Sequence, residues 1–138
     1  MTPTNSLLQT LLNEKGWQNQ YRFILSIGQT CRISADKKIE AHLLAQCTSK
    51  TWLHLTQANN PHIGFGFFSE SKVINGLGWI LLSELQSNAY HNNSSILDHN
   101  ILKNTPLNKH LSASRSNGLS QILQHANALL YTAKNTHH

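Results

Sequence analysis

Cys47 is the residue of this sequence best suited to chemistry, because a thiolate can attack a sulfur or carbon atom of another molecule. A free cysteine, with a reference pKa of about 8.5, is only a few per cent ionised at neutral pH, so a working thiol needs help from its surroundings. Ser49 lies two residues away and could donate a hydrogen bond to the sulfur. Arg115 lies just ahead of a predicted helix, so a cation and a helix N-terminus could both approach Cys47 if the fold brings the two segments together.

The elements that would position these residues follow an α+β pattern. Apolar periodicity predicts a helix at 6–13, capped by Thr4 or Asn5, and a second helix from Trp17 to Gly28. Strands are predicted at 51–57 and 62–68. Three more helices follow: one capped by Ser69 with an apolar face as far as Leu85, a short one at 98–103 stopped by Pro106, and a last one with an apolar face from 119 to 130. Loops are predicted at 29–38 and 86–95. Helices, a small antiparallel sheet and more helices form an α+β fold with the sheet flanked by helices.

Two details of the pattern predict how the middle of the chain packs. Alternation along 51–57 places Thr51 and Leu53 on one face and Trp52 on the other, as in a half-buried strand. Residues 39–45 are predicted to form a short strand or an extended approach to Cys47. Glycine costs about 1 kcal/mol relative to alanine inside a helix. Gly76 and Gly78 are therefore predicted to allow close packing of their helix against the sheet.

The length and apolar runs of the chain exclude several classes of protein. The 138 residues are the size of one domain, with a core predicted over about residues 6–131 and a frayed tail at 132–138. The longest apolar run, around residues 77–82, is much shorter than the roughly 20 residues that span a bilayer. The N-terminus lacks the basic and apolar segments of a secretory signal. These observations predict a cytoplasmic protein without a membrane role.

The formal charge of +5 raises the question of a nucleic-acid partner. It results from eleven Lys and Arg against six Asp and Glu, and the basic residues are scattered without a run of five. Aromatic residues do not alternate with them as stacking platforms would. The pattern argues against nucleic-acid binding and leaves two interpretations, an ordinary surface or a preference for an acidic protein partner.

The two cysteines and nine histidines do not form a predicted metal site. Neither Cys31 nor Cys47 belongs to a Cys-x-x-Cys pair, and no His-x-x-x-His pair falls on a predicted helix. The two cysteines could pair with each other, but a reducing compartment favours free thiols. On composition alone a lone cysteine is more often a small buried apolar side chain than a nucleophile, and Cys31 is interpreted in that way.

Four motifs occur in order along the chain. They are Trp17-x-x-x-Tyr21-x-x-Ile24-x-x-x-Gly28, then Cys47-x-Ser49-x-x-Trp52, then SESKVINGL at 69–77, then LSASRSNGL at 111–119. Their content, order and separations resemble those of the SufE/CsdE family, small proteins that accept persulfide sulfur from a cysteine desulfurase. The likeness covers roughly residues 6 to 130.

This resemblance implies a SufE/NifU-like fold in which Cys47 lies on a loop at one end of the sheet and accepts the sulfur. The partner would be a PLP-dependent cysteine desulfurase like SufS or CsdA, which the chain stimulates, and the sulfur would go to an Fe–S scaffold or another recipient. The chain itself would hold no cofactor. Arg115, Ser49 and His110, a histidine common in the family, are then expected to serve Cys47.

Two departures from the family pattern leave other functions open. Gln46 replaces the glycine that precedes the family's cysteine, and Lys103 stands where the family often has an acidic residue. Our hypothesis is that Lys103 makes the site more electropositive and lowers the thiol pKa. Alternatively, both changes mark a SufE-fold binding module or regulator that has lost sulfur transfer. A third hypothesis is a hydrolase pairing Cys47 with His54 or His110, for which the sequence shows no orienting third group.

Overall fold

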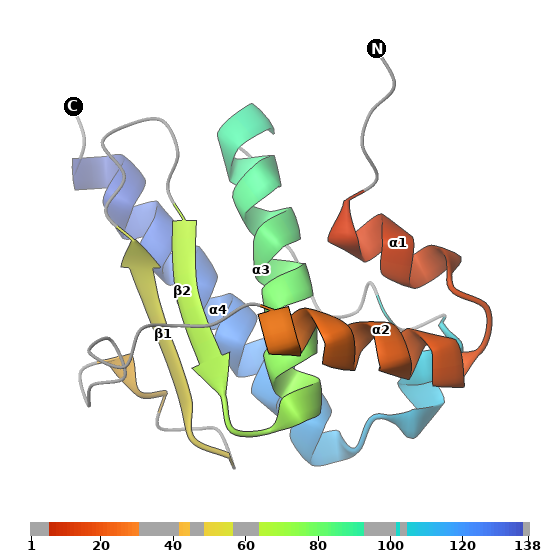
Figure 1. The fold of residues 1–138 in the computed structure, drawn as a ribbon. Coiled ribbons are helices and arrows are strands. Elements are labelled where there is room, and N and C mark those ends of the chain that lie inside the picture. The colour runs from red at the N-terminus through yellow and green to blue at the C-terminus, as the bar shows by residue number, and fades with distance from the viewer. Residues whose placement is uncertain are drawn as a thin grey trace.

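A computed structural model describes residues 6–30, 42–44, 49–56, 64–92, 102 and 105–136 of the chain (Figure 1). Its elements are α1 (Leu7–Asn13), α2 (Trp17–Thr30), β1 (Thr51–Thr56), β2 (Gly64–Ser69), α3 (Lys72–Asn92), the 3-10 helix η4 (Pro106–His110) and α4 (Ala113–Thr136). Helices therefore flank a small antiparallel sheet, and the α+β prediction is confirmed. Within these residues, no helix combines the length and apolarity needed to cross a membrane.

The sheet pairs β1 with β2 in the antiparallel direction, with Thr51 opposite Ser69. The predicted approach segment is described at residues 42–44, where Leu43 forms an isolated bridge with Trp52. Thr51 and Leu53 are each 1% exposed whereas Trp52 is half-buried, so the predicted alternation is confirmed. One face of β1 thus packs on the core, as a strand of this pattern requires.

Helix α3 lies at the centre of the core and contacts α1, α2, α4 and β2. Figure 1 shows α2 crossing α3, with α4 running behind the sheet. A broad face of α3 is buried, as expected for a central helix, while Lys72 and Ser83 are exposed; the buried apolar residues are Val73, Ile74, Leu77, Ile80, Leu81, Leu82 and Leu85. The apolar stripe predicted for the last helix is also buried, at Leu119, Ile122, Leu123, Ala126 and Leu130.

The two glycines of α3 allow close approach to two different neighbours. A Cβ atom at Gly78 would collide with the ring of Phe67 in β2, as predicted for packing on the sheet. A Cβ atom at Gly76 would instead collide with the backbone carbonyl of Ile24 in α2. The prediction was therefore right for Gly78 and wrong for Gly76, whose neighbour is a helix.

The starts of two helices differ from the prediction. Ser6, and not Thr4 or Asn5, caps α1, because its hydroxyl accepts the backbone N–H of Gln9 at 3.0 Å. Helix α3 begins at Lys72, and the hydroxyl of Ser71 accepts the N–H of Ile74 at 3.3 Å. Ser69, the cap that the sequence predicts, is the last residue of β2, because it pairs with Thr51 across the sheet.

Two helices extend beyond their predicted ends. Helix α2 continues past Gly28 to Thr30, and α3 continues through the predicted loop 86–95 as far as Asn92. Extending an existing helix by a residue costs far less than nucleating one, so a polar run can follow a long helix without breaking it.

The segment before the last helix also differs. Pro106 begins η4, where its missing N–H costs nothing, and its role in stopping a helix at 98–103 stays a prediction. Of the helix predicted at 98–103, only Leu102 lies within the described residues. Helix α4 begins at Ala113 and its backbone stays helical to Thr136. Arg115 therefore lies in the first turn of α4 and not ahead of it.

Candidate functional site

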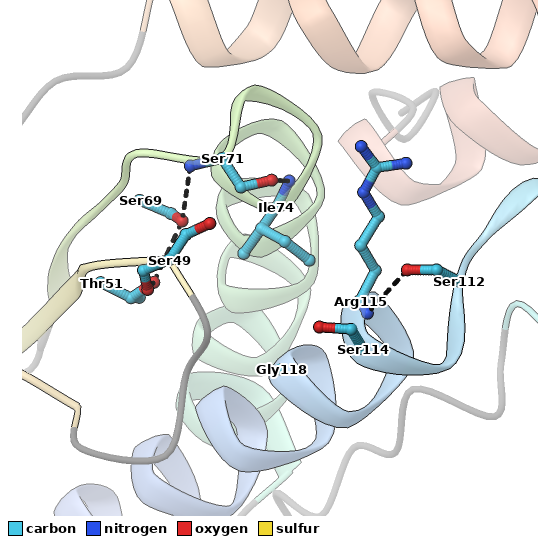
Figure 2. A pocket seen from close by; sticks show the side chains of 9 residues that line it. All are labelled: Ser49, Thr51, Ser69, Ser71, Ile74, Ser112, Ser114, Arg115 and Gly118. Atoms are coloured by element: carbon cyan, nitrogen blue, oxygen red, sulfur yellow. Dashed lines mark hydrogen bonds between the residues drawn. The ribbon is translucent and has the colours of Figure 1, made fainter.

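A cavity of about 400 Å³ lies where the start of β1, the turn between β2 and α3, and the start of α4 meet (Figure 2). Its lining residues come from all three places: Ser49, Thr51, Ser69, Ser71, Ile74, Ser112, Ser114, Arg115 and Gly118. Six of these nine carry a hydroxyl, one carries a guanidinium, and none carries a carboxylate. Hydroxyls both donate and accept hydrogen bonds, so these side chains offer hydrogen-bonding partners to a small polar or anionic group.

The sheet side of the cavity is held by hydrogen bonds between its own hydroxyls and backbone. The buried Thr51 hydroxyl lies 3.0 Å from both the carbonyl oxygen of Ser49 and the hydroxyl oxygen of Ser69. The N–H of Ser71 donates to the Ser69 hydroxyl at 3.2 Å, and the N–H of Glu70 donates to the carbonyl of Lys50 at 2.9 Å. Ser49 is thereby fixed beside the turn that leads into α3.

Two helix N-termini lie at this cavity. Ser71 caps α3, and the Ser112 hydroxyl caps α4 by accepting the N–H of Arg115 at 3.1 Å. The first N–H groups of a helix lack intrahelical partners, and the helix dipole places partial positive charge there. In Figure 2, the half-buried Arg115 lies on the opposite side of the cavity from Ser49, Thr51 and Ser69. The charges at this site therefore favour an anion.

Ser49 and Arg115, two residues that the sequence predicts for the site, line the same cavity although they lie far apart in the chain. Cys47 lies outside the described residues, as do Gln46, Lys103 and Cys31. Two residues span at most about 7 Å, so covalent geometry alone keeps the Cα atom of Cys47 within that distance of the Cα atom of Ser49. The role of Cys47 stays a prediction.

His110, the remaining predicted site residue, is not among the residues that line the cavity. It is exposed and stacks on Trp17, with ring centroids 4.0 Å apart and planes at 25°. Beside this stack, the buried Gln20 donates to the carbonyl of Leu11 at 3.3 Å and accepts the N–H of Leu107 at 3.1 Å. The described contacts of His110 thus join η4 to α2, and any part in chemistry at Cys47 stays a prediction.

The alternatives that rest on histidines have little geometric support among the described residues. His54, considered for a Cys–His hydrolase, does not line the cavity and stacks on His42 with ring centroids 4.8 Å apart. No group of three or more His, Cys, Asp or Glu residues within the described ranges could hold a metal ion.

Asn75 is a structural residue of the site that the sequence prediction missed. Its side chain, 5% exposed, accepts the N–H of Ser69 at 3.1 Å and donates to the carbonyl of Gly28 at 3.0 Å. It therefore ties the turn that bears Ser69 and Ser71 to the end of α2. The local sequence contains little signal for this role, because Asn75 lies off the apolar stripe of the predicted helix and one of its partners belongs to another helix.

Comparison with known proteins adds three findings. The family model of SufE, described as an Fe–S metabolism associated domain, matches residues 5–130. An uncharacterized SufE-like protein of Haemophilus influenzae is 25% identical over 119 residues, which are 86% of this chain and 94% of that one. The sulfur acceptor protein CsdE of Escherichia coli is 28% identical over 107 residues, covering 77% of this chain and 73% of CsdE.

Proposed function

The chain belongs to the SufE family, and on this premise we propose that Cys47 accepts persulfide sulfur from a PLP-dependent cysteine desulfurase. The acceptor then delivers the sulfur to Fe–S cluster assembly or a related sulfur pathway. The name of its relative CsdE, a sulfur acceptor protein, supports this kind of function. PLP belongs to the partner enzyme in this scheme, and Cys47 is the only covalent participant from this chain.

The transfer is a thiol exchange with a balanced outcome. The thiolate of Cys47 attacks the outer sulfur of the donor persulfide, and a new S–S bond forms on Cys47. The S–S bond of the donor breaks, and its electron pair remains on the donor cysteine. That sulfur takes up the proton that Cys47 has released, so no external oxidant or reductant is needed. Both the attacking sulfur and the product persulfide carry negative charge when ionised.

The observation that carries the proposal is the shared cavity of Ser49 and Arg115. A thiolate at this cavity would lie close to serine hydroxyls, to the start of α4 and to one guanidinium, with no carboxylate among the lining residues. Each of these groups favours the ionised sulfur over the neutral thiol. Partial burial of Arg115 strengthens its effect, because less water screens the charge.

The direct test is intact mass spectrometry of the chain after incubation with the desulfurase of the same organism, pyridoxal phosphate and cysteine. We expect the wild type and Cys31→Ser to gain one sulfur atom, and Cys47→Ser to gain none. Binding to the desulfurase without any sulfur adduct on the wild type would refute transfer and support the alternative, a SufE-fold binding module or regulator.

A second experiment tests the cavity. Arg115→Gln removes the guanidinium and keeps a polar side chain, and we expect it to slow adduct formation roughly tenfold. Alkylation of Cys47 by iodoacetamide at neutral pH should slow in parallel, because it depends on the thiolate fraction. Arg22→Gln is the matched control, since Arg22 is exposed on α2 and donates only to Asn19, at 3.3 Å. Equal rates for the two variants would show that Arg115 does not serve Cys47.

A further inference from the structure

One arginine lines the cavity and two lysines directly follow lining residues in the sequence, and we call these three cations the basic rim: Lys50, Lys72 and Arg115. Lys50 follows the lining residue Ser49, and Lys72 follows the lining residue Ser71. Both lysines are exposed, while Arg115 is half-buried on the third side. The basic rim therefore comes from three separate segments of the chain: the residue before β1, the start of α3 and the start of α4.

Among the described residues, the basic rim has few acidic neighbours. Glu70 is the one acidic residue among those described that adjoins the rim, so three cations stand against one carboxylate. In the described part of the chain, none of the three cations forms an ion pair. Unpaired charges of one sign project a potential that attracts a partner of the opposite sign and speeds its approach.

Any protein that hands sulfur to Cys47 must cover the basic rim. A specific interface buries about 800 Å² on each partner, a patch much wider than the reach of one side chain. The donor sulfur must reach bonding distance of a residue two positions from Ser49, so the centre of the interface is fixed there. Lys50 and Lys72 then lie inside the interface or at its edge.

We propose that the basic rim selects a partner whose reactive cysteine is surrounded by Asp and Glu side chains. The inference rests on the proposed function and adds the chemistry of the partner surface. Three cations on separate segments of the chain match a few carboxylates of a folded protein better than the regular phosphate array of a nucleic acid.

The test compares two double variants that change the net charge equally. Lys50→Glu/Lys72→Glu reverses the charge of the two rim residues that do not line the cavity. Lys15→Glu/Arg22→Glu reverses two exposed cations, one in the α1–α2 connection and one in α2, neither of which lines the cavity or adjoins a lining residue. We expect the rim variant to raise the chain concentration that gives half-maximal adduct formation roughly tenfold, and the control less than twofold. The difference should shrink between about 50 mM and about 500 mM salt, because salt screens exposed charges.

Three outcomes would overturn the proposal. They are equal shifts for both variants, no shift for the rim variant, and displacement of the desulfurase by a single-stranded oligonucleotide at the rim. Circular dichroism of each variant checks that it is folded. Failure of the proposed function can be told apart from failure of the basic-rim proposal. If sulfur transfer fails, the wild type gains no sulfur, but calorimetry of its binding to the desulfurase still measures the effect of the rim variant.

Discussion

The contact between α2 and α3 and the wall of the cavity each contain a glycine, Gly76 and Gly118, in opposite surroundings. A Cβ atom at Gly76 would meet the carbonyl oxygen and side chain of Ile24, whereas one at Gly118 would have no atom within 4 Å. At the first position glycine is required because two helices touch. At the second it leaves space beside Arg115 that a side chain could fill. Glycine thus allows close helix packing in the core and leaves unfilled space at the cavity.

The largest expected effect is that of Gly76→Ala. The added methyl group would press on backbone atoms of Ile24, which cannot rotate away, so α2 and α3 would have to separate. We expect a loss of about 3 kcal/mol in the free energy of unfolding, measured by urea denaturation. Gly118→Ala is the matched control. An unchanged stability for Gly76→Ala would show that the two helices pack less closely than the structure indicates.

Asn75→Ala tests whether the side-chain hydrogen bonds of Asn75 hold the turn at the cavity against the end of α2. The change leaves the N–H of Ser69 and the carbonyl of Gly28 without their partner, which should cost about 2 kcal/mol. Asn127→Ala is the control, because the Asn127 amide donates only to the Leu123 carbonyl one turn earlier in its own helix, at 2.9 Å. Similar losses for the two variants would mean that Asn75 does not hold the turn in place.

Gly118→Ala should separate stability from function. Alanine is favoured over glycine inside a helix, and space is available, so we expect a gain of about 0.5 to 1 kcal/mol in unfolding free energy. The methyl group also enters the cavity, so sulfur acceptance by Cys47 should fall by a few fold. Mass spectrometry and denaturation on the same sample measure both. Higher stability with full acceptance would show that the reaction does not use this part of the cavity.

The predictions that succeeded depend on apolar patterns that burial enforces. The stripe of α4 and the alternation of β1 are of this kind, because a wrong register would expose the core. The predicted cap at Ser69 failed because pairing with Thr51, a distant residue, draws Ser69 into β2. The predicted loop at 86–95 failed because local polarity does not end a helix that tertiary packing has already established.

The candidate site was predictable to a smaller extent. Ser49 and Arg115 were chosen through a family resemblance, since nothing in their own segments shows that the two segments meet. The structure brings both to the cavity. Asn75 could not be chosen, because one of its partners is the carbonyl of Gly28 in another helix. Residues defined by long-range hydrogen bonds leave only a weak trace in local sequence.

The smallest expected effect concerns His125, on α4 outside both compared regions. Partial burial lowers the pKa of His125 below its ordinary value of 6.5. The unfolded chain therefore binds this proton more readily, so stability is complete above about pH 6.5 and falls as the pH drops through the lowered folded value. Because the ring is largely exposed, we expect His125→Gln to reduce the fall in Tm between about pH 7.5 and about pH 5.5 by only on the order of 1 °C. The effects of the other histidines cancel in this comparison, so an identical fall in both proteins would show that burial of His125 contributes nothing to the pH dependence.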